Sequence, residues 1–248
     1  MLKAYTAHEA CYRDLRNSGC KSWDQYHKVS PDFEQFYMRP FVEMALSKAS
    51  FSFPAKALEV GCGTGPLSCF LATQGFQVDG VDISATAIAL AEEESRARGL
   101  SIRYWISDVC HDPLGVDEYD LIVDGHCLHC IVDPNDRRSS LLNIRNALTH
   151  DGQLWVDSMI TTPTTNFGES SYLDSDGVLW VKTSKETEFS DQRFIDGRWH
   201  LPTRKLHLTS EAFVSELKQA GFSIEWSRSA PPDKNGEPAG FQAICKKQ

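Results

Sequence analysis

The stretch ALEVGCGTG, residues 57–65, decides the fold. Its first residues have the composition of a short buried strand, and Gly61, Gly63 and Gly65 follow at alternate positions. Glycine weakens the interior of a strand or helix, so a cluster directly after a strand indicates a tight turn that a ligand approaches closely. A helical pattern begins at the last of these glycines. The sequence therefore predicts a strand, a glycine loop and a helix that form one wall of a binding site.

Strand-like and helix-like segments alternate regularly around this loop. Five strands are expected. In chain order, the first three cover residues 55–60, 77–84 and 101–108, and the fifth covers residues 152–160. The fourth begins at residue 119 and carries CLHC (127–130) at its apolar end. The expected helices cover residues 30–49 with Ser30 as N-cap, 65–75, 85–99 and 136–152. Each connection is long enough for a βαβ unit, which predicts an α/β fold with a parallel sheet and helices on both faces.

The chain changes character after residue 160. Residues 161–205 are rich in Ser, Thr, Gly, Asp and aromatic residues, so we expect an irregular insertion with one or two short strands, such as VLWVKT. Residues 209–222 have the pattern of a helix, with Thr209 or Ser210 as its N-cap. The segments FSIEWSRSA and GFQAICKK, joined by the polar turn PPDKNGEPA, predict a final antiparallel hairpin.

The composition limits the classes of function. The chain has 248 residues, enough for one α/β domain with an insertion, and its formal net charge is −9. Phosphate contacts supply most of the affinity for nucleic acids, so this charge argues against a nucleic-acid partner. No apolar run approaches the roughly 20 residues that span a bilayer, and the N-terminus lacks a signal-peptide core. We therefore expect a cytoplasmic protein with no membrane partner, and the sequence leaves the oligomeric state open.

Acidic residues indicate which ligand the glycine loop holds. Asp82 ends the second expected strand, 21 residues after Gly61, where a carboxylate can accept hydrogen bonds from ribose hydroxyls. The loop is preceded by Glu59, which would repel a phosphate but suits a positively charged ligand. S-adenosylmethionine carries an ammonium and a sulfonium and no phosphate, so it fits this pattern better than a dinucleotide does.

Four motifs together resemble the class I S-adenosylmethionine-dependent methyltransferases. They are LEVGCGTG, the acid ending GVDIS, the SD of WISDVC, and YDLIVDGHCLH, in the order and at the spacing of that family. The resemblance covers about residues 55–160. It implies a Rossmann-like seven-stranded fold with a mostly parallel sheet and a C-terminal antiparallel hairpin.

The resemblance also implies cofactor contacts, residue by residue. Glu59 and the loop of Gly61, Cys62, Gly63 and Gly65 would hold the methionine end of the cofactor. Asp82 would bind the ribose diol, and Ile83 would pack against the adenine ring. Asp108 and the Val109 amide would bind the polar edge of the adenine, and Asp124 or its neighbours would lie under the methionine ammonium. Each acid also has a structural interpretation, as a cap of a strand end for Glu59 and Asp124 or as a helix N-cap for Asp82 and Asp108.

The stretch DGHCLHC (124–130) lies nearest the transferable methyl group if this fold is right. His126 and His129 are the candidate catalytic bases, because an imidazole with its ordinary pKa of roughly 6.5 accepts protons at neutral pH. Either histidine could instead point into the core. Cys127 and Cys130 fit apolar packing, and CLHC has no second cysteine pair downstream, so no metal site is expected.

Two further features resemble the thiopurine and thiol methyltransferase-like enzymes. DGHCLH followed by DRR is similar to a motif after their fourth strand, although this chain has D-G-H-C where they have D-S-G-C. Trp23 and Tyr26 in SWDQYH are similar to their W-x-x-Y, which covers the cofactor. That resemblance implies a small-molecule acceptor, with sulfur favoured as the acceptor atom.

The insertion supplies candidate residues for a substrate cover. Tyr172, Trp180, Trp199 and Arg204 could line an acceptor pocket, with aromatic walls and an arginine that pairs with a carboxylate. Phe194 and Arg198 are weaker candidates, and all these aromatics could equally fill a small separate core.

The sequence thus predicts an S-adenosylmethionine-dependent methyltransferase that releases S-adenosylhomocysteine and acts on S, N or O of a small molecule. The alternatives are a protein or peptide methyltransferase and a noncatalytic S-adenosylmethionine-binding module. Within one methyltransferase domain (1–248), the expected parts are a helical cover (1–50), the cofactor core (55–160), the insertion (161–205) and a C-terminal helix and hairpin (206–248).

Overall fold

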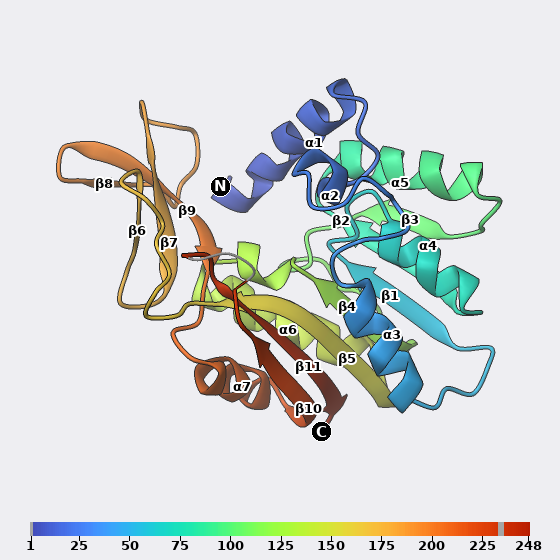
Figure 1. Ribbon diagram of the computed structural model, residues 1–248. Coiled ribbons are helices and arrows are strands. Elements are labelled where there is room, and N and C mark those ends of the chain that lie inside the picture. The colour runs from blue at the N-terminus through green and yellow to red at the C-terminus, as the bar shows by residue number, and fades with distance from the viewer. Residues whose placement is uncertain (1, 233–235) are drawn as a thin grey trace.

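The protein is built around one seven-stranded sheet in the order β10-β11-β5-β4-β1-β2-β3, seen in a computed structural model that describes residues 2–232 and 236–248 (Figure 1). The parallel strands are β1 (Lys56–Val60), β2 (Gln77–Asp82), β3 (Arg103–Ile106), β4 (Tyr119–Gly125) and β5 (Leu148–Ile160). The antiparallel strands are β10 (Phe222–Ala230) and β11 (Ala239–Lys247). The predicted fold class, five parallel strands with a final hairpin, is confirmed. Part of the predicted turn PPDKNGEPA falls on residues 233–235, outside the described residues.

Helices cover both faces of this sheet. The longer ones are α1 (His8–Asn17), α3 (Arg39–Lys48), α4 (Pro66–Thr73), α5 (Ala85–Ala97), α6 (Pro134–Ala147) and α7 (Ser210–Gln219). The short ones are η1 (Ala4–Ala7), α2 (Trp23–Tyr26) and η2 (Leu128–Cys130). Within the described ranges, no helix is long and apolar enough to cross a bilayer.

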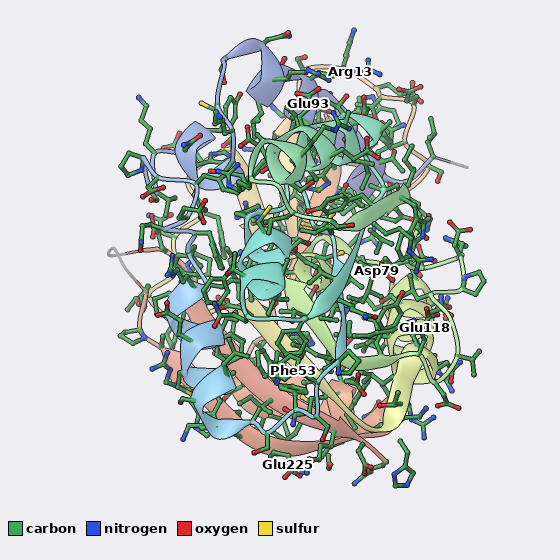
Figure 2. The ribbon with its side chains drawn as sticks, turned by 90° about the vertical axis from the view of Figure 1, so that its right-hand side faces the viewer. Arg13, Phe53, Asp79, Glu93, Glu118 and Glu225 are labelled. Atoms are coloured by element: carbon green, nitrogen blue, oxygen red, sulfur yellow. The ribbon has the colours of Figure 1, made fainter. Side chains whose placement is uncertain are left out.

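Alternation along the strands divides the core into two layers. Leu58 and Val60 of β1 join one apolar cluster with residues of α6 and α7, whereas Ala57 joins a second cluster with residues of α3 and α4. Strands buried on both faces are typical of a parallel sheet between helix layers. At the edge strand β3, Arg103 forms an ion pair with Asp79 of β2. Asp79 is labelled beside the sheet in Figure 2. Because Arg103 is exposed, that pair contributes at most about 1 kcal/mol.

Three predicted element boundaries are wrong. The helix expected over residues 136–152 ends at Ala147, because the chain from Leu148 onward already belongs to β5, where Leu148 pairs with Tyr119 of β4. The helix expected from Ser30 begins at Arg39 instead, because Pro40 needs no hydrogen-bonded N–H and fits the first turn of a helix. The fourth strand ends at Gly125, so CLHC forms the 3₁₀ turn η2 rather than a strand end. The cause of this turn is Asp124, whose Oδ1 accepts hydrogen bonds from the Cys127 and Leu128 amides (3.1 and 2.9 Å).

The insertion is more regular than predicted. It forms a separate four-stranded antiparallel sheet, at the left of Figure 1, with the order β6-β7-β9-β8. Its strands are β6 (Ser171–Leu173), β7 (Val178–Thr183), β8 (Arg193–Ile195) and β9 (Arg198–Lys205). Asp196 and Gly197 both have positive φ (49° and 74°), as the hairpin turn between β8 and β9 requires. The Asp-Gly pair is a hairpin signal that the sequence analysis did not use.

The structure shows which residues cap α7 and α5 at their N-termini. Thr209, and not Ser210, caps α7, since its side chain accepts a hydrogen bond from the Ala212 amide. Ser84 caps α5 by accepting from the Ala87 amide. Asp82 is therefore not the N-cap of α5, and this alternative from the sequence is wrong.

A buried arginine ties η2 to two helices. Arg137 of α6 is 2 % exposed and donates two hydrogen bonds to the Glu216 carboxylate of α7 (2.7 and 2.6 Å). Its third nitrogen donates to the carbonyl oxygens of Leu128 and Ile131 at the two ends of η2. One guanidinium thus fixes the turn that follows β4 and joins α6 to α7.

We expect Arg137→Met to lower the free energy of unfolding by about 3 kcal/mol, because it removes the four hydrogen bonds that the guanidinium donates to Glu216 and to the carbonyls of Leu128 and Ile131. Arg138→Met, on the exposed side of the same helix, is the matched control and should change it by less than about 0.5 kcal/mol. Urea unfolding measures both values. Equal values for the two variants would contradict the structural role of Arg137.

Candidate functional site

A cavity lies at the carboxyl ends of the parallel strands, beneath the N-terminal segment. Its walls are Tyr5, His8, Tyr12, Gly61, Asp82, Ile83, Ser107, Asp108, Val109, Cys110, His126, Cys127, Cys130 and Ile131. Six residues singled out from the sequence are among them, namely Gly61, Asp82, Ile83, Asp108, Val109 and His126. The other predicted cofactor or catalytic residues stand behind or beside these walls, namely Tyr26, Glu59, Cys62, Gly63, Gly65, Asp124 and His129.

The glycine loop needs its glycines for both conformation and space. Gly61, Gly63 and Gly65 all have φ in the left-handed region (66°, 53° and 80°). A Cβ atom on Gly61 would lie 2.5 Å from the Cβ of Cys127, and one on Gly63 would lie 2.6 Å from the Tyr12 hydroxyl. The loop therefore packs directly against the turn after β4 and against α1.

The Asp82 carboxylate ties this loop to the end of β2. Its Oδ2 accepts a hydrogen bond from the Gly63 amide and its Oδ1 accepts one from the Ser84 amide, both at 2.9 Å. Burial raises the pKa of Asp82, and these two bonds lower it. Each carboxylate oxygen has a second lone pair, so Asp82 can still accept bonds from two hydroxyl groups in the cavity.

Asp108 is surrounded by donors. Its Oδ2 lies 3.0 Å from both the Tyr5 hydroxyl and the His111 Nδ1, and its Oδ1 accepts from the Cys110 amide at 3.0 Å. Asp108, Cys110 and His111 also bring ligand atoms within 4.8 Å of one another, a spacing that could hold a metal ion. Burial raises the pKa of Cys110, which keeps it a neutral thiol and a weak ligand at neutral pH.

Two buried acids lie on neighbouring strands below the loop. Burial raises the pKa of Glu59 to about 8, and its Oε2 accepts a hydrogen bond from Ser68 at 2.5 Å. Burial likewise raises the pKa of Asp124 to about 7. Among the described residues, no donor reaches the buried Oδ2 of Asp124. A carboxylate oxygen without a donor in such a place suits a cationic ligand group.

The two predicted catalytic histidines differ in their surroundings. His126 lines the cavity, and its Nε2 lies 3.0 Å from Oδ1 of the buried Asp157. His129 is 3 % exposed, its ring meets that of His126 edge to face, and its Nδ1 has no partner among the described residues. Burial lowers the pKa of His129 well below its ordinary value, so it is a neutral imidazole behind the wall.

Residues of η1 and α1 that were not predicted as site residues also reach the cavity or the loops beside it. The Tyr5 carbonyl lies 2.7 Å from His8 Nδ1, and His8 Nε2 lies 3.6 Å from the Cys130 sulfur. Glu9 accepts hydrogen bonds from the Ser84 hydroxyl and from the amide and hydroxyl of Thr86 (2.7, 3.1 and 2.8 Å). No motif marks these residues, because each contact joins segments that are far apart in the chain.

The residues predicted for the substrate and the cofactor cover lie outside the cavity walls. Trp180 is 3 % exposed, donates to Asp174 and stacks on Tyr172, whereas Trp199 packs on Phe194. Burial lowers the pKa of both His27 and His129, and the charge of the nearby Arg204 lowers both further. Trp23 packs on Tyr12, with ring centroids 5.4 Å apart, and on Tyr26 at 6.2 Å. Their functional roles stay predictions.

Comparisons with known proteins match this chain to methyltransferases. Residues 57–152 match the family described as "Methyltransferase domain". A putative methyltransferase of Geobacillus sp. (strain WCH70) is 26% identical over 215 residues, 80% of this chain and 86% of that protein. Ribosomal RNA small subunit methyltransferase C of Alcanivorax borkumensis is 30% identical over 136 residues, 55% of this chain and 34% of that protein.

A solved structure shares the fold across the whole chain. It is Burkholderia thailandensis 1,6-didemethyltoxoflavin-N1-methyltransferase with bound 1,6-didemethyltoxoflavin and S-adenosylhomocysteine. The TM-score is 0.61 at 18% identity, and the alignment covers 100% of this chain and 92% of that one.

We expect Gly61→Ala to destabilise the protein more than Gly99→Ala does. Both glycines have φ near 66°, but nothing lies within 4 Å of a Cβ on Gly99. Gly99→Ala should therefore cost only the backbone strain, about 1 kcal/mol, and Gly61→Ala about 1–3 kcal/mol more from the contact with Cys127. Chemical unfolding measures the difference, and a difference of zero would refute the close packing of loop and turn.

Proposed function

The chain belongs to the class I S-adenosylmethionine-dependent methyltransferase family, and we propose that it methylates an S, N or O atom of a small molecule with His126 as the base. The observation that carries this proposal is the covered cavity. His126 lies in its wall, and α1 lies across the carboxyl ends of the strands. A covered cavity admits a small acceptor more readily than a folded polymer.

S-adenosylmethionine is the cofactor and S-adenosylhomocysteine the product. The residues present fit it: a glycine loop whose Gly61 lies in the cavity wall, a two-oxygen acceptor at Asp82, and a buried oxygen at Asp124 that no donor reaches among the described residues. We assign the ribose hydroxyls to Asp82, the ammonium to Asp124, and the adenine to Ile83, Asp108 and the Val109 amide. When bound, the cofactor supplies a methyl group that its sulfonium has already activated for displacement.

His126 removes the proton that the acceptor loses. Because the Asp157 carboxylate can only accept, the hydrogen of the neutral ring sits on Nε2 and leaves Nδ1 as the base. The carboxylate also stabilises the imidazolium that forms once the proton has moved. The walls around the cavity, largely apolar apart from these groups, orient the acceptor for in-line transfer and exclude water.

Other acceptors have weaker support. The match to the ribosomal RNA enzyme covers 34% of that protein, and a net charge of −9 opposes RNA binding. A protein or peptide acceptor would need a groove open to a chain, which a covered cavity does not favour. Sulfur as the acceptor atom and the thiopurine-like assignment stay predictions from the motif alone. A noncatalytic module would bind S-adenosylmethionine but transfer no methyl group, so turnover distinguishes it from the enzyme that we propose.

Deuterated-methyl S-adenosylmethionine tests the proposal directly. The protein and this cofactor are incubated with a host-cell extract, and metabolite, protein and RNA fractions are analysed by mass spectrometry. Heavy methyl in a metabolite supports the proposal and gives the mass of the acceptor. Heavy methyl only in protein or RNA overturns it, and so does bound cofactor with no transfer in any fraction.

We expect S-adenosylhomocysteine to bind about tenfold more tightly at pH 8 than at pH 6. The pKa of Asp124 is raised to about 7, so the acid is mostly protonated at pH 6 and must release its proton to pair with the ammonium. Asp124→Asn should weaken binding at pH 8 and flatten this dependence. Asp120→Asn, at the far end of β4, is the matched control. Calorimetry at three pH values decides, and an unchanged slope in Asp124→Asn would count against the assignment.

His126→Asn should lower turnover about 100-fold or more and change S-adenosylhomocysteine affinity less than twofold. Asparagine tolerates the left-handed backbone of this position, where φ is 69°. His150→Asn, at a residue whose side chain is 98% exposed, should have no effect. Rates are measured on the acceptor found by labelling. A full rate in His126→Asn would exclude this histidine as the base.

A further inference from the structure

We propose that Asp157, Gln242 and Arg228 form a row of positioning residues that fixes the tautomer and direction of His126. The inference rests on the proposed function for its catalytic meaning. Its evidence is independent of that function, because it consists of side-chain contacts that cross three strands of the sheet.

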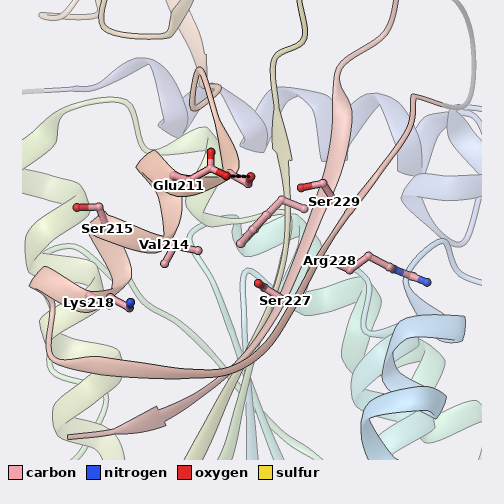
Figure 3. A pocket seen from close by; sticks show the side chains of 9 residues that line it. Glu211, Val214, Ser215, Lys218, Ser227, Arg228 and Ser229 are labelled. Carbon is pink, nitrogen blue, oxygen red and sulfur yellow. Dashed lines mark hydrogen bonds between the residues drawn. The ribbon is translucent and has the colours of Figure 1, made fainter.

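Sheet register places these side chains on one face. Asp157 of β5 is opposite Gln242 of β11, which is opposite Arg228 of β10. Figure 3 shows the direction of Arg228: the side chains of Ser227 and Ser229 are turned toward the hollow beside α7, and that of Arg228 points away from it. The row therefore runs along the opposite face of the sheet, from its outer edge toward the cavity.

Hydrogen bonds connect every step of the row. Arg228 Nη2 donates to Gln242 Oε1 at 2.7 Å, and Gln242 Nε2 donates to Asp157 Oδ2 at 2.6 Å. Asp157 Oδ1 lies 3.0 Å from His126 Nε2. Asp157 is 1 % exposed, so these partners, and not water, satisfy its charge.

The chemistry of the groups fixes the polarity of the row. A guanidinium only donates and a carboxylate only accepts, so the Gln242 amide has one allowed orientation. Its oxygen must face Arg228, and its nitrogen must face Asp157. Asp157 then keeps an acceptor for His126, which places the ring hydrogen on Nε2. The row therefore selects the tautomer whose Nδ1 is free to accept a proton.

The backbone of His126 supports the same interpretation. Its φ of 69° is a conformation that residues other than glycine adopt rarely, and its amide donates to the Asp157 carbonyl at 3.2 Å. Asp157 thus holds both the backbone and the ring of His126. Strained backbone of this kind persists only where the surrounding contacts determine it strongly.

Other titratable groups also face His126. Its charge acts on Asp124 of β4, Asp24 of α2 and His129 of η2, and the Tyr37 ring meets it edge to face. Among the residues that the structure describes, Asp157 is the one with a hydrogen bond to a ring nitrogen of His126. The tautomer is therefore the property that distinguishes the row from these other groups.

The test is nitrogen NMR of protein labelled with ¹⁵N-histidine, which reports the tautomer and pKa of each ring without any acceptor. The His126→Asn variant assigns the His126 signals. Gln242→Met keeps the side-chain length but removes the donor to Asp157. Gln153→Met, at another glutamine of the same sheet, is the matched control because the Gln153 side chain accepts from Trp155 and, among the described residues, has no bond to the row.

We expect neutral His126 to carry its hydrogen on Nε2 in the unchanged protein and in Gln153→Met. In Gln242→Met the Asp157 carboxylate loses the donor that holds its Oδ2 and is free to turn its Oδ1 away from His126 Nε2. Without that fixed acceptor, the share of the Nδ1–H tautomer in the neutral ring should rise clearly above its share in the unchanged protein. Arg228→Met should shift the tautomer in the same direction but less.

Two results would overturn the row. One is an Nδ1–H tautomer in the unchanged protein, and the other is an unaltered tautomer in a folded Gln242→Met. If the tautomer responds as expected but no small molecule accepts heavy methyl, the row stands and the proposed function fails. A loss of stability without a tautomer change would show a structural role only, and that also counts against the proposal.

Discussion

The hydrogen bonds that Asp82 accepts from the Gly63 and Ser84 amides hold the cavity together. Both amides lie beyond strand ends, where no neighbouring strand can accept from them, and a buried amide without an acceptor costs about 1–3 kcal/mol. Ser84 in turn caps α5 and donates to Glu9 of α1. One carboxylate therefore sets the glycine loop, the start of α5 and, through Ser84, the position of α1.

A second anchor at the end of β4 sets the position of the base. Asp124 accepts from the amides of Cys127 and Leu128, and Arg137 donates to the carbonyls of Leu128 and Ile131. The turn η2 is thus held at both its donor and its acceptor ends. His126 lies between β4 and this turn, so its strained backbone is stabilised by contacts on both sides.

Much of the fold follows from the sequence, because strand–helix alternation and the glycine loop are local patterns with a direct physical meaning. The loop residues and the acids at the strand ends were found for the same reason. Boundaries failed where one side chain overrides a pattern, as Pro40 does for α3 and Asp124 does for η2. Of the small sheet, only the strand VLWVKT (β7) was predicted by name, although Asp196 and Gly197 signal a hairpin between β8 and β9.

Contacts between distant segments have no such local pattern. Tyr5 reaches Asp108, Gln242 reaches Asp157, and neither pair could be found before the sheet order and the path of α1 were known. The same holds for His129, which the sequence places as close to the chemistry as His126 but which lies behind the cavity wall. Residue type and spacing identify candidates, and only the register of the sheet separates them.

The way α1 is attached follows from how little apolar surface it shares with the sheet. Tyr12 and Leu15 pack with Ala87 and Leu90 of α5 in a small cluster that is separate from the two main layers of the core. The polar contacts from Tyr5, His8 and Glu9 each contribute about 1 kcal/mol. Lifting α1 would therefore break these contacts, together with the packing of Tyr12 on the loop at Gly63, and would open the side of the cavity that His8 and Tyr12 line. The sheet and the row behind His126 would keep their packing. Access to the cavity and rigidity of the catalytic geometry are consequently supplied by different parts of the structure.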